Sequence, residues 1–346
     1  PHALSDRQAQ QPGRHLAHPA NRGYPKKKDP AAHISWLVNT HYYAFTGMSA
    51  DVDELIEFKR DEWSRLTQAP QLFGFLRELH GMTFDCVLDF QGLFRSGLCT
   101  WFARAPQKVG FADAREGAPL FYKHKATIPT GICHAVDRNI ALLDSAFGTT
   151  HEYVAPRFRR DQAAQQQAGD LLQQHGLADS DKLVAVGPAT RWESKSWPPS
   201  FFADTITHIM NTAAPDTRFW LLGTASEAEV GRAIIDRLGS DSVCSFMGAT
   251  DLPVMMDLLR RSRLLLTNDS GPMHIAAALG LPTVALFGPT DPDKTGPYGD
   301  GHHVFRTQVD CAPCFKRQCP LPEQLCRSDV ISPAGVGDCI VRMLAP

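Results

Sequence analysis

From residue 33 onward, hydrophobic positions follow two spacings that alternate along the chain. Short continuous apolar runs predict buried strands, and apolar residues three and four positions apart predict amphipathic helices. The predicted strands cover residues 33–38, 54–58, 84–90, 182–188, 218–223, 242–246, 264–268 and 283–288. The predicted helices lie within 71–81, 91–105, 134–147, 161–175, 198–210, 226–239, 251–262 and 274–279. Strands that alternate with helices predict parallel sheets covered by helices on both faces.

A polar stretch without periodicity, residues 148–160, separates two such series. The 346 residues also exceed the size at which one hydrophobic core stops growing. We therefore predict an α/β protein with two doubly wound domains that face a cleft, and place the boundary between residues 155 and 156.

Composition narrows the class of protein. Apolar residues make up 43% of the chain and charged residues 21%, as in an ordinary globular protein. A net charge of −2 argues against a general nucleic-acid binder, so we expect no nucleic-acid partner. No apolar run reaches the length of a membrane span, and no signal-peptide pattern is visible. We interpret the nine cysteines as free thiols, which persist in a reducing compartment. We therefore expect a cytoplasmic protein.

Candidate chemistry lies where two of the predicted strands end. Asp269, Ser270 and Gly271 follow a buried strand and open a helix, and His274 and Thr290 belong to the same sheet edge. Ligands of parallel sheets bind beyond the carboxyl ends of the strands, and free N–H groups at a helix start favour anions such as a diphosphate. The alternative, for Ser270 and Gly271 taken alone, is an ordinary strand–helix turn.

The second candidate loop is GPATRWESKSWPPSFF, residues 187–202, which also follows a strand and precedes a helix. Lys195 in this loop is a mobile point charge able to neutralise phosphate. From this loop alone, a solvated surface lysine is the favoured interpretation. Its position at the same sheet edge as Asp269 favours phosphate contact.

Three segments resemble glycosyltransferase family nine, the lipopolysaccharide heptosyltransferases: NDSGPMHIAAALGLPTVALFGPTDP, RWESKSW and DFQGLFRSG. GFADAREGAPLFY and HAVDRN look like the subgroup that adds the first heptose to the Kdo inner core. The resemblance extends from about residue 33 to the end of the chain. It implies the GT-B fold of two facing Rossmann-like domains, an acceptor-binding domain at 26–155 and a nucleotide-sugar domain at 156–346.

The resemblance also implies an activity: inverting transfer of heptose from ADP-heptose to the lipid-anchored Kdo inner core, without a metal or other cofactor. The enzyme would contact the inner face of the cytoplasmic membrane transiently. It implies a donor site at Thr190, Lys195, Asp269, Ser270, Gly271 and His274. It implies an acceptor side at Gln91, Arg95 and Ser96. The alternatives are another nucleotide-sugar transferase or epimerase of GT-B fold, or an impaired remnant that only binds nucleotide.

The start of the chain departs from that family. Family members begin with a buried strand and a Ser-Ser-Leu-Gly-Asp loop whose aspartate is the usual candidate base. Here residues 1–25 show neither strand nor helix spacing, so we expect the first strand to be missing or disordered and the catalytic base is unknown. Residues 2–19, back-translated with freely chosen codons and read one nucleotide out of register, encode MRFLIVKPSSLGDILHTL. We interpret this aberrant segment as a wrong-frame translation; a genuine disordered extension is the alternative.

Four cysteines, Cys311, Cys314, Cys319 and Cys326, lie close together after the last predicted strand. Four thiols in a short loop can hold a structural zinc ion. Their spacing differs from a standard zinc knuckle, and the resembling family reacts without metal. Zinc is therefore the weaker interpretation, and we expect no metal.

Overall fold

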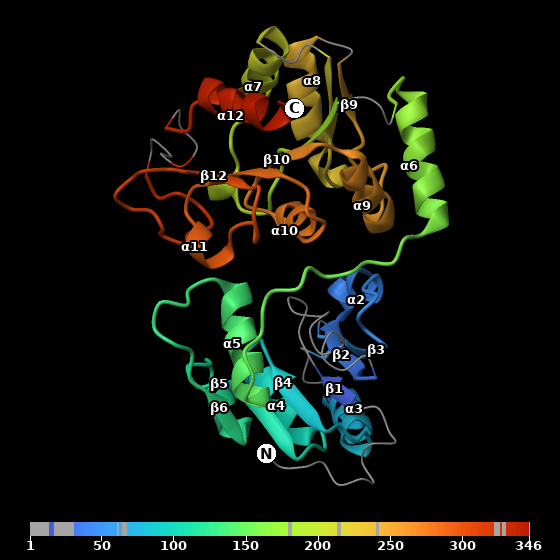
Figure 1. The fold of residues 1–346 in the computed structure, drawn as a ribbon, viewed down its shortest axis with the longest axis vertical. Coiled ribbons are helices and arrows are strands. Elements are labelled where there is room, and N and C mark those ends of the chain that lie inside the picture. The colour runs from blue at the N-terminus through green and yellow to red at the C-terminus, as the bar shows by residue number, and fades with distance from the viewer. Residues whose placement is uncertain are drawn as a thin grey trace. The chain divides into compact units, whose positions relative to one another are not determined.

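The computed structural model describes residues 14–16, 31–60, 62–63, 68–178, 182–212, 216–239, 242–321, 326 and 330–345. The chain divides into two compact units, Pro1–Arg159 and Arg160–Pro346 (Figure 1). The division lies inside the polar stretch at 148–160. Each unit holds one six-stranded sheet.

In the N-terminal unit all neighbouring strands are parallel, in the order β3-β2-β1-β4-β5-β6. The strands are β1 (Arg14–Leu16), β2 (His33–Asn39), β3 (Glu54–Phe58), β4 (Cys86–Asp89), β5 (Gln107–Phe111) and β6 (His124–Ala126). The helices are α2 (Thr40–Gly47), α3 (Ala69–Gly81), α4 (Phe94–Phe102) and α5 (Ala135–Phe147), with a 3₁₀ turn at Ala118–Phe121. The sequence did not predict α2, β5 or β6.

Strand β1 corrects one expectation. The sequence predicted no strand within residues 1–25, yet Arg14–Leu16 occupies the centre of the sheet and pairs in parallel with β2 and β4. The physical reason is that ladder hydrogen bonds come from backbone groups, so three extended residues other than proline can bridge two strands without an apolar pattern. The other residues of 1–25 lie outside the described residues, as does the lysine run at 26–28.

The C-terminal unit has a second parallel sheet, in the order β12-β11-β10-β7-β8-β9. Its strands are β7 (Lys182–Gly187), β8 (Thr217–Leu221), β9 (Val243–Ser245), β10 (Leu264–Asn268), β11 (Thr283–Phe287) and β12 (His303–Arg306). Its helices are α6 (Gln162–Gln174), α7 (Pro199–Asn211), α8 (Ala228–Leu238), α9 (Leu252–Arg261), α10 (Gly271–Ala278), α11 (Pro292–Thr295) and α12 (Pro333–Leu344), with 3₁₀ turns at Glu193–Lys195 and Ala225–Glu227.

Helices cover both faces of this second sheet, as the alternating pattern predicts. Val184 and Val186 of β7 pack into a cluster that includes side chains of α7 and α12, whereas Leu183 and Ala185 pack into a second cluster with α6 and α9. Every residue of β10 and β11 is buried. The α/β class with parallel sheets is therefore confirmed.

Both sheets have the same connectivity. In each, the chain adds strands on one side of the first strand and then returns to add the rest on the other side. This is the 3-2-1-4-5-6 order of the Rossmann fold, in which ligands bind where the strand order reverses. That switch point lies between β1 and β4 in the first unit and between β7 and β10 in the second. Among the described residues, the loops after β4, β7 and β10 are where a ligand is expected.

Candidate functional site

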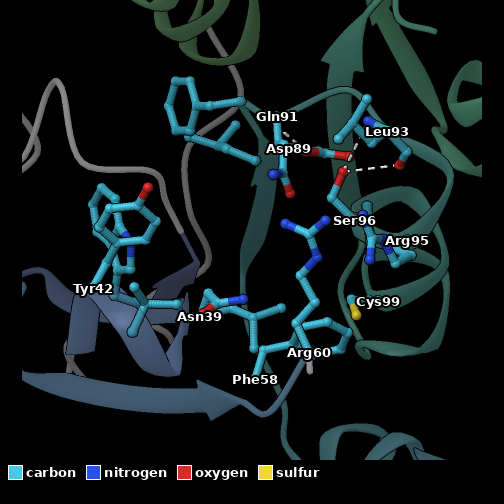
Figure 2. A pocket seen from close by; sticks show the side chains of 16 residues that line it. Asn39, Tyr42, Phe58, Arg60, Asp89, Gln91, Leu93, Arg95, Ser96 and Cys99 are labelled. Carbon is cyan, nitrogen blue, oxygen red and sulfur yellow. Dashed lines mark hydrogen bonds between the residues drawn. The ribbon is translucent and has the colours of Figure 1, made fainter. Parts of the chain in front are cut away.

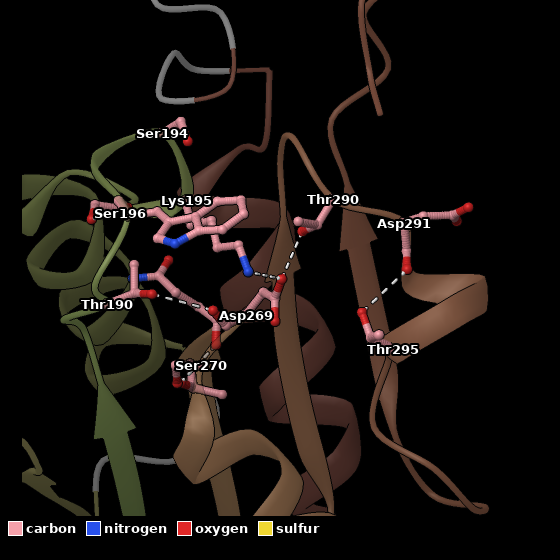
Figure 3. A network of polar contacts seen from close by, with 12 residues as sticks. Thr190, Ser194, Lys195, Ser196, Asp269, Ser270, Thr290, Asp291 and Thr295 are labelled. Carbon is pink, nitrogen blue, oxygen red and sulfur yellow. Dashed lines mark hydrogen bonds and ion pairs between the residues drawn. The ribbon is translucent and has the colours of Figure 1, made fainter. Parts of the chain in front are cut away.

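The loops after β7 and β10 bring Lys195 and Asp269 into direct contact. The Lys195 Nζ lies 2.6 Å from Oδ2 of Asp269, and the Thr290 hydroxyl from the loop after β11 donates to the same oxygen at 2.6 Å (Figure 3). The side chains of Lys195 and Asp269 are only 16% and 7% exposed. The carboxylate thus anchors an ammonium group and a hydroxyl at the switch point of the sheet.

The aromatic face of Trp192 lies beside the same ammonium group. Lys195 Nζ is 4.5 Å from the centroid of the Trp192 ring, within the range of a cation–π contact. The ammonium group is therefore held from two directions, by the ring and by the Asp269 carboxylate. A charge held in this way is preorganised for an anionic ligand.

The remaining predicted donor-site residues lie around this contact. The Thr190 hydroxyl donates to the Asp269 carbonyl at 3.3 Å. Helix α10 begins at Gly271, and its N-cap, Ser270, makes no side-chain cap hydrogen bond. The space beside Gly271 is open, since an added Cβ would meet nothing within 4 Å. His274 lies exposed in the first turn of α10. The amino end of this helix can thus accept an anion through its first N–H groups.

Asn268, the last residue of β10, fixes both ends of the loop that carries Lys195. Its Nδ2 donates to the Pro188 carbonyl at 2.7 Å, and its Oδ1 accepts from the Trp197 N–H at 3.1 Å. The Asn268 side chain is fully buried. The sequence analysis missed this role, although an amide side chain that ends the apolar run LLLTN was the available signal.

A cavity of about 290 Å³ lies in the N-terminal unit at the ends of β2 and β4 (Figure 2). All three predicted acceptor-side residues, Gln91, Arg95 and Ser96, line it. The Ser96 hydroxyl donates to the Leu93 carbonyl at 2.9 Å and accepts from the Leu93 N–H at 3.1 Å. Ser96 therefore shapes the start of α4, while Gln91 and Arg95 are exposed on the cavity wall.

Arg60, which the sequence analysis missed, lines this cavity from the chain that leaves β3. Figure 2 shows its guanidinium pointing toward Gln91 and Ser96. With Arg95, the cavity wall carries two guanidinium groups, which pair well with carboxylates and phosphates. A basic residue just after a strand end was the only signal in the sequence.

Asp89, at the end of β4, holds the loop beside the cavity. Its Oδ1 accepts from the N–H groups of Gln91 and Gly92 at 2.9 and 3.1 Å, and its Oδ2 accepts from the Tyr122 hydroxyl at 2.7 Å. Burial, with the nearby Asp89 carboxylate, raises the pKa of Tyr122 well above its usual value. The Tyr122 ring packs so closely on Gly110 that a Cβ there would lie 2.3 Å from it.

The four cysteines of the candidate zinc loop all lie among the described residues. All four thiols are free, with Cys311 exposed. Within the described part of the chain, no group of three or more His, Cys, Asp or Glu side chains is arranged to hold a metal ion. Burial, with a smaller contribution from the other three thiols, raises the pKa of Cys326 to about 11. The zinc interpretation of this loop stays a prediction.

Comparison with known proteins places these features in a family context. Residues 72–324 match the profile of glycosyltransferase family 9 (heptosyltransferase). Lipopolysaccharide heptosyltransferase 1 of Pseudomonas aeruginosa is 26% identical over 302 residues, which cover 84% of this chain and 79% of that protein.

Solved structures agree with the fold. The family 9 glycosyl transferase from Veillonella parvula has a TM-score of 0.78 at 22% identity, covering 96% of this chain and 97% of that one. Escherichia coli heptosyltransferase WaaC with ADP has a TM-score of 0.71 at 23% identity, covering 95% and 99%. The same enzyme with ADP-2-deoxy-2-fluoro heptose has a TM-score of 0.66 at 24% identity, covering 85% and 93%.

Proposed function

The chain belongs to glycosyltransferase family 9, and from this premise we propose that it transfers heptose from ADP-heptose to the Kdo inner core of lipopolysaccharide with inversion. The observation that carries the proposal is the Lys195–Asp269 contact at the switch point of the C-terminal sheet. The relatives support the donor, since WaaC structures contain ADP and an ADP-heptose analogue.

The proposed donor site acts on the leaving group. As the acceptor hydroxyl attacks the anomeric carbon, the bond from that carbon to the phosphate oxygen breaks and ADP departs with the electron pair. Lys195 and the first N–H groups of α10 offer positive charge to the diphosphate, where negative charge develops. Asp269, Thr190 and Thr290 keep that charge and the loop around it in place.

The proposed acceptor site is the cavity lined by Arg60 and Arg95. Kdo is an acidic sugar, and a guanidinium group binds a carboxylate through two parallel hydrogen bonds. Among the described residues, no helix has the length and apolar composition needed to cross a bilayer. We place the reaction in the cytoplasm, with transient contact at the inner face of the membrane where a lipid-anchored acceptor is displayed.

The attacking hydroxyl must lose its proton to a general base. The family's loop aspartate is absent from this sequence, and Asp89 is 4% exposed with both oxygens engaged. We therefore propose that residues 1–25 are an out-of-frame version of the segment that supplies the base. As written, the chain then binds nucleotide and transfers little heptose, which makes the impaired remnant the second candidate.

A donor competition assay tests the proposal. The protein is incubated with a Kdo-containing lipid acceptor and ADP-, UDP- or GDP-linked sugars, and product and ligand binding are measured separately. Binding selective for ADP supports the donor site even if turnover is slow. Preference for UDP or GDP would instead favour another nucleotide-sugar transferase or an epimerase.

A further inference from the structure

Ser194, the residue before Lys195, is held by a segment more than a hundred residues away. Its hydroxyl donates to the Lys316 carbonyl at 2.6 Å, and its N–H donates to the Arg317 carbonyl at 3.2 Å. Ser194 is only 2% exposed. A buried residue with both of its donors engaged cannot shift without breaking these bonds. The backbone next to Lys195 is therefore fixed by Lys316 and Arg317.

The same distant segment contacts the other loop of the site. The Phe315 N–H donates to the Pro289 carbonyl at 2.9 Å, one residue before Thr290. At Gly288, an added Cβ would lie 2.8 Å from Cβ of Cys326 and 3.4 Å from the Ser194 carbonyl oxygen. The loops after β7 and β11 are thus packed together through residues 315–317 and Cys326.

A side-chain contact runs parallel to these backbone bonds. The Arg317 guanidinium lies 5.6 Å from the centroid of Trp192, the ring that also contacts the Lys195 ammonium. Arg317 therefore contacts the Trp192 ring through its guanidinium and the Ser194 N–H through its carbonyl. Within the loop of Lys195, both Trp192 and Ser194 thus depend on the same distant segment.

We propose that residues 315–317 and Ser194 form a clamp that positions Lys195 against Asp269 for binding the donor diphosphate. Ser194 acts as a positioning residue, and residues 315–317 supply the carbonyl groups that it needs. The proposal rests on the proposed function, because it assumes that Lys195 contacts the diphosphate. The position of Lys195 in the ligand-free protein is measurable without that assumption.

The test is the acetylation rate of Lys195 by acetic anhydride, followed by mass spectrometry in the absence of nucleotide. In Ser194→Ala the rate is expected to rise about fivefold, the factor that corresponds to one net hydrogen bond. Ser262→Ala is the matched control, because Ser262 is also buried and hydrogen-bonded but lies at the far end of β10. Equal rates in wild type and Ser194→Ala, or an equal rise in both variants, would overturn the clamp.

Two further measurements separate the clamp from general stability and from the proposed function. The Ser194 amide of the wild-type protein is expected to be protected from hydrogen exchange, so fast exchange there refutes the clamp even if the variant does not fold. With ADP as the probe, Ser194→Ala should weaken binding, and adding it to Lys195→Met should weaken binding no further. Additive losses would show that Ser194 does not act through Lys195. Slow, clamp-dependent acetylation of Lys195 in a protein that does not bind ADP would refute the proposed donor site and leave the clamp standing.

Discussion

The ammonium group of Lys195 and the carboxylate of Asp269 meet at 2.6 Å although they belong to loops after two different strands of one sheet. Strands β7 and β10 are neighbours in that sheet and flank the point where its strand order reverses. The pair therefore marks the position at which a Rossmann fold binds its ligand.

Replacing Lys195 by Met should weaken ADP binding about 10- to 100-fold, because a charge-assisted hydrogen bond to a phosphate is lost. Calorimetric titration with ADP measures the change. Lys182→Met is the control. Lys182 pairs with Asp216 at the surface, so its substitution removes the same charge far from the switch point. Equal affinities of the Lys195 variant and the control would contradict the proposed phosphate contact.

Replacing Arg60 or Arg95 by Ala should raise the KM for the acidic acceptor about tenfold and leave ADP affinity unchanged. Added salt should raise the KM for the acceptor more in the wild-type protein than in either variant, because salt screens exposed charges. Initial rates at varied acceptor concentration check this, with Arg77→Ala as an exposed control on α3. A change in ADP affinity alone would argue against an acceptor role for the cavity.

Tyr122→Phe should lower the free energy of unfolding by about 2 kcal/mol, because the buried Asp89 carboxylate loses its hydroxyl donor. The raised pKa of Tyr122 keeps its proton in place at neutral and mildly alkaline pH. This stabilisation is full below the unfolded pKa of about 10 and is lost only as pH rises through the higher folded value. Urea unfolding should therefore give the same difference in free energy of unfolding between wild type and Tyr122→Phe at pH 7 and at pH 9. Tyr43→Phe, at an exposed tyrosine, should have no effect.

Substituting MRFLIVKPSSLGDILHTL for residues 2–19 should raise the heptose transfer rate by at least about a hundredfold, the scale of a restored general base. ADP affinity should stay the same, because the proposed donor residues are in the other unit. A scrambled peptide of the same composition is the control. Transfer at the restored rate by the unaltered chain would show that residues 1–25 are functional as they stand.

Iodoacetamide at pH 7.5 should modify the exposed Cys311 and Cys133 well before Cys326. The pKa of Cys326 is raised to about 11, so its reactive thiolate is scarce at neutral pH and increases as pH approaches that value. Peptide mapping at pH 7.5 and 10 gives the order. Rapid modification of Cys326 at pH 7.5 would show that the pKa of its thiol is not raised.

The sequence predicted strands well where apolar runs were continuous, since β3 and β10 match their predicted bounds. It missed β5, QKVGF, because charged and glycine residues interrupt the apolar pattern, although four of its five residues are buried. Helix α10 begins three residues before its predicted start, at Gly271. Pro272 there is compatible with a first helical turn, in which its missing N–H needs no partner.

The candidate site was predictable only in part. Lys195 and Asp269 both follow predicted strands. The carboxyl ends of parallel strands lie at the same edge of a sheet, so the sequence placed both residues at that edge. The sequence contained no signal for Ser194 or Tyr122, whose partners come from remote segments. Such contacts depend on tertiary packing, which local spacing does not encode.

The Lys195–Asp269–Thr290 cluster is drawn wholly from the second of the two units. If this cluster binds the donor diphosphate as proposed, one unit alone captures the sugar nucleotide. A copy that captures the donor without transferring it would then withhold that donor from active copies of the enzyme, in proportion to its abundance.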